Sequence, residues 1–338
     1  MSAFPLFILS SSEYIEWCIL VKGLQAFLTK KKGITYMKDV IFGGTGWAAS
    51  SAIRLLLEKF DGNLNTMEVY GSRARKQILE SGHVLNIKHL GSLEDKAKVR
   101  YFLPFSFLTV DKFAACGEEQ FRLVNSKLIQ HSIDFIARNE PKYCIVLSSG
   151  IVHSDLSITS RSLSYQVYKE LKIQEEEALK SQCKKSGTRL ILCRLFSASG
   201  REIRSVKRYA ISDLAYQGLV HREITVTNPR KVMRKYVDMG QLLEICLLAV
   251  QEDAELLEFD STGELVELHD LATLVAQELN LHKTEFFALE SDTDKYFSES
   301  RDSETLGLKF GISLFPIEKQ VKETILGVKR LIESGGLD

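Results

Sequence analysis

From Met37 onward, short apolar runs alternate with longer segments in which apolar residues recur every three or four positions. Spacing of three or four is typical of an amphipathic helix, and a continuous apolar run of four to eight residues is typical of a strand buried on both faces. The pattern therefore predicts an α/β fold with a doubly wound parallel sheet. The predicted strands span residues 39–44, 66–72, 83–91, 101–108, 143–150 and 189–196, and the predicted helices span residues 49–60, 119–138 and 164–184.

Beyond residue 196 the alternation is less regular, and the elements that it predicts are shorter and mixed. We expect residues 37–196, completed by residues 236–262, to form the sheet domain. Residues 197–235 and 263–338 then form a smaller mixed C-terminal lobe that binds substrate at the carboxyl ends of the strands. In this region the predicted strands span residues 224–229 and 256–263, and the predicted helices span residues 238–251, 268–280 and 316–334.

The first 36 residues do not fit this pattern. They are rich in apolar residues, but Glu13, Glu16 and Lys22 interrupt them, and no run approaches the ~20 apolar residues that span a bilayer. The segment also lacks the basic start and the small-residue cleavage site of a secretory signal. We expect no membrane span and interpret residues 1–36 as an N-terminal extension, with Met37 as the natural start. A helical appendage that contacts another copy or a membrane surface is the alternative.

Charge and cysteine content exclude several classes of protein. The 338 residues include 44 Lys and Arg and 44 Asp and Glu, so the formal net charge is zero. A neutral chain without a long basic run is not expected to bind nucleic acid. Six cysteines form no C-x-x-C pair, and with seven scattered histidines they predict neither a zinc site nor a disulfide framework. We therefore expect no metal, a reducing compartment and a cytoplasmic location.

A glycine-rich turn stands between the first predicted strand and the first predicted helix. Gly43, Gly44, Thr45, Gly46, Trp47, Ala48 and Ala49 follow the strand directly. In a G-x-x-G-x-x-A turn, Gly43 allows the tight turn, Gly46 allows close approach of a pyrophosphate, and Ala49 lets the helix pack on its strand. The helix N-terminus then offers free N–H groups to the phosphates. This arrangement predicts a Rossmann-type NAD(P)-binding domain.

The end of the second predicted strand bears on the choice of cofactor. An enzyme that prefers NAD carries Asp or Glu here, to bind the ribose 2′-hydroxyl. Ser72 and Arg73 occupy these positions instead, with Arg75 and Lys76 close behind. A guanidinium suits a 2′-phosphate, which a carboxylate would repel. We therefore predict NADP as the cofactor, with NAD as the alternative; an ordinary solvated basic turn would carry no preference.

Residues 162–172, SLSYQVYKELK, contain a candidate acid/base. On a helix that begins near Ser164, Tyr165 and Lys169 lie one turn apart on the same face. Tyr168 is rotated by about 100° from that lysine. An ammonium beside a phenol lowers the pKa of the phenol from its usual value of about 10. The spacing therefore favours Tyr165, while packing of both tyrosines on an amphipathic helix is the alternative.

The glycine turn, Ser149, Tyr165 and Lys169 together resemble the extended short-chain dehydrogenase/reductase family, specifically its NAD(P)-dependent sugar epimerase/dehydratase branch. The resemblance runs from Met37 to about residue 332. "SSGIV" is similar to the S-[ST]-x-x-V stretch of that family, which implies Ser149 as the catalytic hydroxyl. "YQVYK" is similar to its Y-x-x-x-K motif, which implies Tyr165 as the acid/base.

Two further segments resemble the family but also depart from it. "LCRLFSASG" is similar to LRxxNxYG and places Arg194 at the matching arginine, although Ser197 and Ser199 replace the asparagine and tyrosine. "VMRKYVDMGQLLE" is similar to RDFVxVxDxA and implies Arg234 as the residue that contacts a substrate diphosphate, although Gln241 replaces the aspartate. No second diphosphate arginine stands between residues 287 and 296. The residues thus support the fold more than the nucleotide-sugar substrate.

The resemblance implies hydride exchange between a substrate carbinol carbon and nicotinamide, a nucleotide-sugar substrate and a homodimer. Tyr165 would move the hydroxyl proton, Lys169 would lower its pKa and hold the nicotinamide ribose, and Ser149 would bind the substrate oxygen. Gly150 and Ile151 stand where dehydratases carry an extra acid/base pair, so we expect epimerisation or keto reduction rather than dehydration. The alternatives are an NADPH-dependent reductase of a non-sugar carbonyl and a cofactor-binding protein without catalysis.

Overall fold

The computed structural model describes residues 37–60, 62–93, 98–153, 162–287 and 293–336. The expectations for residues 1–36 lie outside these residues. Residues Met37–Asp338 form one compact unit.

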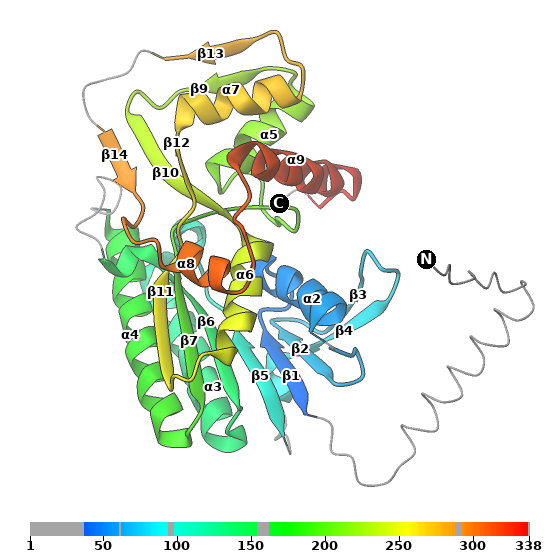
Figure 1. Cartoon of the computed structure of the whole chain (residues 1–338), viewed down its shortest axis with the longest axis vertical. Helices are drawn as coiled ribbons and strands as arrows, with labels where there is room; N and C mark the ends of the chain where they lie inside the picture. Colours follow the sequence, from blue (N-terminus) through cyan, green and yellow to red (C-terminus); the bar gives the residue numbers. More distant parts are fainter. Residues whose placement is uncertain (1–36, 61, 94–97, 154–161, 288–292, 337–338) are drawn as a thin grey trace, which may run out of the picture. The chain divides into compact units, whose positions relative to one another are not determined.

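An eight-stranded sheet, mostly parallel, forms the centre of the first half of the unit (Figure 1). Its strand order is β11-β7-β6-β5-β1-β2-β4-β3, and neighbouring strands are parallel except for the edge strand β3, which is antiparallel to β4. The predicted α/β fold with a Rossmann-type doubly wound sheet is therefore confirmed. The strands are β1 (Lys38–Phe42), β2 (Met67–Gly71), β3 (Arg75–Ile78), β4 (Val84–His89), β5 (Val99–Pro104), β6 (Tyr143–Ser149), β7 (Arg189–Leu195) and β11 (Leu256–Asp260).

Helices cover both faces of this sheet, which explains why its strands are apolar on both sides. In β1, Val40 and Phe42 pack in one core cluster with Phe135, whereas Ile41 packs in the other with Leu56. Successive strand residues point to opposite faces, so a strand between two helical layers needs apolar residues at every position. The first layer contains α3 (Phe113–Asn139) and α4 (Leu163–Ser186), and the second contains α2 (Trp47–Lys59) and α6 (Met239–Leu248).

A second, smaller group of elements completes the unit. The strand β10 (Lys231–Asp238) pairs with three others and forms a mixed sheet, and β9 pairs with β13. These elements are β8 (Ser197–Ser199), β9 (Ile224–Val226), β12 (Glu264–Glu267), β13 (Thr284–Phe286), β14 (Thr293–Tyr296), α5 (Ala210–Val220), α7 (Leu268–Glu278), α8 (Asp302–Lys309) and α9 (Ile317–Glu333). Short 3₁₀ turns span Leu90–Ser92, Val110–Lys112, Gly150–His153 and Ala249–Gln251.

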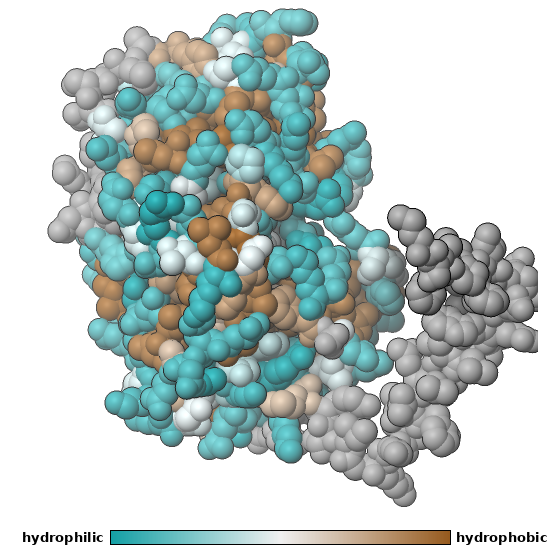
Figure 2. Space-filling view, viewed as in Figure 1, coloured by the Kyte–Doolittle hydropathy of each residue, from teal (hydrophilic) through white to brown (hydrophobic). Residues whose placement is uncertain are grey.

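Hydrophilic residues cover much of the face drawn in Figure 2, and hydrophobic residues show between them in patches. Among the helices of the described residues, none combines the length and apolarity that crossing a bilayer requires.

The first six predicted strands correspond to β1, β2, β4, β5, β6 and β7. The edge strand β3 was not predicted, because its sequence, RKQI, is polar and lacks an apolar run. Its ladder with β4 holds it in place, with Arg75 opposite Ile87. Tertiary pairing rather than local propensity therefore forms this strand.

Asp238 is a buried carboxylic acid at the N-terminus of a helix. It is the N-cap of α6, where its carboxylate accepts a hydrogen bond from the Gln241 N–H at 3.0 Å. Burial raises the pKa of Asp238 to about 6, and the nearby carboxylates of Glu202 and Glu323 add to the rise that Gln241 and Arg54 oppose. The folded state therefore holds this proton more tightly than the unfolded chain.

We predict that Asp238→Asn stabilises the protein above pH 6. Between about pH 4 and pH 6 the unfolded chain releases this proton first, so the wild-type group lowers the free energy of unfolding as pH rises. Asparagine caps a helix as well as aspartate does and carries no charge. The gain at pH 8 should be on the order of 2 kcal/mol and should shrink towards pH 4. Urea unfolding across pH measures it. The exposed variant Asp302→Asn is the control, and a gain independent of pH would contradict the argument.

Candidate active site

The glycine turn links β1 to α2 and lies against the backbone that follows β5. Gly43 has a positive φ of 76°, and a Cβ there would lie 2.6 Å from the Phe105 carbonyl oxygen. The Gly46 N–H donates to the Gly43 carbonyl at 2.8 Å and closes the turn. The helix starts at Trp47 without a side-chain cap, so its first N–H groups remain available to an anion.

A cavity of about 250 Å³ opens beside this turn. Two buried polar atoms of lining residues, Trp47 Nε1 and Ser148 Oγ, have no hydrogen-bond partner among the described residues. Buried polar groups are normally paired, so these two atoms indicate a ligand with polar groups of its own. Together with the helix N-terminus they fit a dinucleotide. The lining residues are Gly46, Trp47, Ala48, Ala49, Pro104, Phe105, Phe107, Thr109, Leu147, Ser148, Tyr168, Lys172, Leu195, Arg204, Ser205, Arg208, Tyr209 and Met239.

Helix α4 brings Tyr168 and Lys172, rather than Tyr165 and Lys169, to the wall of this cavity. Tyr168 begins a stripe of residues spaced by three or four that continues into the buried face of α4. Tyr165 and Lys169 are partly buried beside this stripe. Residues 168–172 read YKELK, so a second Y-x-x-x-K pair overlaps the first, and this repeat in the sequence could have revealed the pair.

Lys172 is a buried cation with two close neighbours. Its Nζ donates to the Glu175 carboxylate at 2.7 Å and lies 3.9 Å from the centre of the Phe107 ring. Burial lowers the pKa of Lys172, but the charges of Glu175, Tyr168 and Glu176 outweigh burial and raise it. The Lys172 side chain therefore stays a charged ammonium, one helical turn from Tyr168.

Ser149, the predicted catalytic hydroxyl, lies at the carboxyl end of β6. Its Oγ is 3.3 Å from the hydroxyl of Tyr296 on β14 and accepts a hydrogen bond from the Ile151 N–H. Burial strongly raises the pKa of Tyr296, and the nearby phenols of Tyr168 and Tyr165 add to the rise. Tyr296 is therefore a neutral hydroxyl beside Ser149, and no family motif in the sequence pointed to it.

Arg234, the predicted substrate residue, is held by its own strand neighbour. Its Nη2 donates to the Asp294 carboxylate at 2.7 Å, and its Nη1 donates to the carbonyls of Asp294 and Met233. Its guanidinium also lies 5.8 Å from the Tyr296 ring centre. A substrate diphosphate would therefore compete with Asp294 for this arginine.

Two residues predicted to select the cofactor lie elsewhere, and a buried asparagine supports the cavity from behind. Ser72 and Arg73 are exposed in the turn after β2 and do not line the 250 Å³ cavity. Asn125 of α3 is fully buried, and its side chain bonds both the N–H and the carbonyl of Leu108. It thus holds the segment that carries Phe105 and Phe107 along the cavity.

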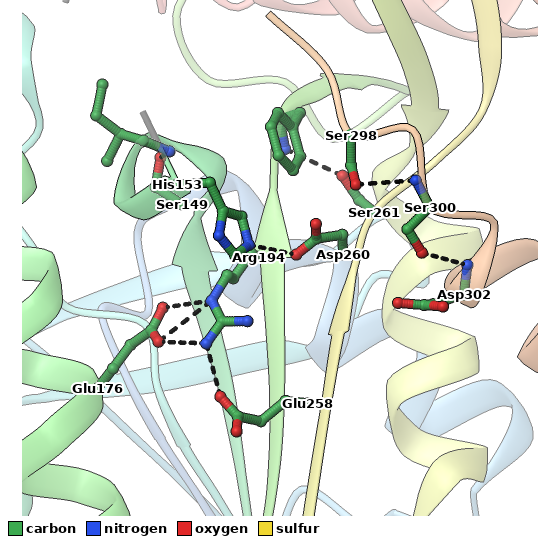
Figure 3. Close-up of polar contacts among 12 residues, drawn as sticks. Ser149, His153, Glu176, Arg194, Glu258, Asp260, Ser261, Ser298, Ser300 and Asp302 are labelled. Atoms are coloured by element: carbon green, nitrogen blue, oxygen red, sulfur yellow. Dashed lines mark hydrogen bonds and ion pairs between the residues drawn. The ribbon is translucent and has the colours of Figure 1, made fainter. Parts of the chain in front are cut away.

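Arg194 joins three elements through two ion pairs, of which the one to Glu176 is the more buried (Figure 3). It donates to Glu176 of α4 at 2.6 and 3.0 Å and to Glu258 of β11 at 2.6 Å. Near it, His153 bonds Asp260 at 3.1 Å. Arg194 does not line the cavity, so its contribution is to hold α4 against the sheet.

Within the described ranges, no group of three or more His, Cys, Asp or Glu side chains is arranged to hold a metal ion.

Comparison with known proteins identifies the fold. No protein-family model and no curated protein sequence matches the chain. Among solved structures, MoeE5 in complex with UDP-glucose and NAD has a TM-score of 0.67 and 14% identity, over 87% of this chain and 99% of that one. TunA, a NAD-dependent NDP-hexosamine 5,6-dehydratase, has a TM-score of 0.68 and 14% identity, over 87% and 98%.

A third similar structure is the UDP-N-acetylglucosamine 4-epimerase of Methanobrevibacter ruminantium M1 in complex with UDP-N-acetylmuramic acid. It has a TM-score of 0.68 and 16% identity, over 89% of this chain and 100% of that one. The predicted resemblance to the sugar epimerase/dehydratase branch of the extended short-chain dehydrogenases/reductases is confirmed for the fold.

We predict that Arg194→Met destabilises the protein by about 3 kcal/mol. The change leaves the buried Glu176 carboxylate with Lys180 as its remaining cation, at 3.6 Å, and an unpaired buried charge is costly. Guanidinium unfolding measures the loss. Arg189→Met on the same strand is the matched control, because its partner Asp253 is exposed and exposed ion pairs contribute little. Equal losses in both variants would contradict the role of the cluster.

Proposed function

We propose that the chain is an NAD(P)-dependent oxidoreductase or epimerase that acts on a carbinol or keto carbon, of a nucleotide-activated sugar. One observation carries the proposal: residues 46–49 of the glycine turn, the Tyr168–Lys172 pair and two residues with unpartnered buried polar atoms line a single cavity. The similar structures support the substrate class, since one is in complex with UDP-glucose and NAD and another is a UDP-sugar epimerase.

The bound nicotinamide would supply or accept the hydride, and the residues of the chain would manage the proton. Tyr168 donates or accepts it at the phenol oxygen, and the charged Lys172 lies one helical turn away on the same wall of the cavity. A serine hydroxyl at the end of β6 binds the substrate oxygen. Ser149 is the hydroxyl that the family resemblance implies, and Ser148, which lines the cavity, is the second candidate.

The overlapping pair Tyr165 and Lys169 stays a competing prediction from the sequence. Geometry favours Tyr168, because it lines the cavity and its lysine is buried beside it. Gly150 and Ile151 follow the serines and carry no group that transfers protons, which disfavours dehydration. A reductase of a non-sugar carbonyl is the alternative function. The ion pair between Arg234 and Asp294 favours it, because it neutralises the arginine expected at a diphosphate.

We predict that Tyr168→Phe lowers kcat by about 100-fold or more, because the phenol that moves the proton is lost. Tyr165→Phe should keep most of the activity. The assay is NAD(P)H-linked turnover with UDP-glucose and UDP-N-acetylglucosamine as probes, with cofactor binding by calorimetry as the check on folding. If Tyr165→Phe loses the activity and Tyr168→Phe keeps it, the assignment returns to Tyr165 and Lys169.

The turn after β2 supports NADP as the cofactor. Ser72 and Arg73 follow the last residue of β2, Gly71, where a NAD-binding chain carries a carboxylate. Both side chains are exposed, and neither has a carboxylate partner among the described residues. Reductases release oxidised cofactor at each turnover and often use NADPH, so this preference favours keto reduction over self-contained epimerisation.

We predict that the wild-type protein binds NADP(H) more tightly than NAD(H). Arg73→Ala should weaken NADP(H) by about tenfold or more and leave NAD(H) nearly unchanged, because a charge-assisted hydrogen bond to the 2′-phosphate is lost. Calorimetric titration with both cofactors measures the ratio. Lys127→Ala, on the exposed face of α3, is the control. Tighter NAD(H) in the wild type, or an unchanged ratio in Arg73→Ala, would favour an epimerase that retains NAD.

A further inference from the structure

A second cavity, of about 440 Å³, lies next to the candidate active site. It is enclosed by α2, the turn after β3, the segment after β8 and α9, and it shares one lining residue, Arg204, with the smaller cavity. Apolar side chains such as Ile53, Leu57 and Leu331 form part of its wall.

Five arginines line this cavity, and three of them are neutralised by carboxylates. Arg54 pairs with Glu202, Arg201 pairs with Glu323, and Arg330 pairs with Glu80. The other two arginines, Arg75 and Arg204, have no carboxylate within ion-pairing distance among the described residues.

Arg204 instead reaches across to α2. Its Nη2 and Nε donate to the Ser50 hydroxyl at 2.9 and 3.2 Å. Burial, together with the positive charge of Arg75, lowers the pKa of Arg204. Two unneutralised cations thus face one cavity beside a hydroxyl, an arrangement that an anion would stabilise.

The position of Arg75 and Arg204, called the cation pair below, indicates which anion they would bind. Ser50 lies in the first turn of α2, directly after the glycine turn, and its hydroxyl donates to the Gly46 carbonyl. Arg75 begins β3, four residues after the end of β2. In this fold the adenosine ribose binds at the end of the second strand, next to the glycine turn. The cation pair therefore lies near the region in which this fold binds the adenosine ribose.

We propose that Arg204, with Arg75 and Ser50, binds the 2′-phosphate of NADP(H). This inference rests on the proposed dinucleotide function. It adds a specificity residue from the segment after β8, about 130 residues beyond the turn that carries Arg73. The second lobe then contributes to the choice between NADP(H) and NAD(H). The residues directly after β2 do not determine the cofactor preference alone.

The test compares two probes that differ at the 2′-position, adenosine 2′,5′-bisphosphate and adenosine 5′-monophosphate. Calorimetry on the full chain gives the dissociation constants for wild type, Arg204→Gln, Arg204→Lys and Arg75→Gln. Arg204→Gln should weaken the bisphosphate by about tenfold and the monophosphate by less than twofold, and Arg204→Lys should lose less. Arg201→Gln, in the same cavity but paired with Glu323, is the matched control, and thermal melting verifies folding.

Other outcomes overturn distinct parts of the argument. An equal loss for both probes in Arg204→Gln would mean that Arg204 contacts the shared 5′-phosphate, and an unchanged ratio would mean that it contacts neither; either result overturns this inference alone. If the wild type binds the monophosphate as tightly as the bisphosphate, the NADP preference fails with it. If the wild type binds neither probe, the dinucleotide function fails as well.

Discussion

The orientation of α4 depends on an ion-pair cluster in which Arg194 of β7 binds the buried Glu176 of α4 and the more exposed Glu258 of β11. A buried carboxylate that loses its cation costs several kcal/mol, so α4 cannot rotate or slide without breaking this contact. Lys172 and Tyr168 stand one and two turns before Glu176 on the same helix. The cluster therefore determines which of the overlapping Y-x-x-x-K pairs reaches the cavity, although it lies outside the cavity itself.

The opposite wall of the cavity is held by hydrogen bonds of a buried side chain. The Asn125 amide binds both backbone groups of Leu108, which fixes the segment that carries Phe107 over the Lys172 ammonium. The ammonium is thus enclosed by an aromatic face and by Glu175, and it stays charged although it is buried. Trp47 and Ser148, which line the same cavity, each carry a buried polar atom without a hydrogen-bond partner among the described residues.

The alternating pattern was sufficient to predict the parallel sheet, because central strands such as β1, β5 and β6 are largely apolar on both faces. The glycine turn was also predictable from the sequence. The backbone of Phe105 lies so close to Gly43 that no Cβ fits there, so the turn requires glycine at this position. The choice between tyrosines was not predictable from helical spacing, because both pairs satisfy the same four-residue rule. It depends on contacts of Arg194 and Phe107 that are remote in sequence. Short strands such as β3 and β14 form through pairing, so local sequence carries little signal for them.

The edge strand β3 has a consequence for solubility. Among the described residues no strand pairs with the outer edge of β3, and such an edge is a template on which another chain can add a strand. Arg75 and Lys76 place two positive charges on this edge, and charged side chains of this kind oppose aggregation. Ile78, at the end of the same strand, is 75% exposed, and an exposed apolar side chain on an edge strand favours aggregation. The basic residues of β3 therefore oppose self-association of the sheet, whichever cofactor the protein binds. A substitution of Arg75 that alters the choice of cofactor would also change the tendency of this edge to aggregate.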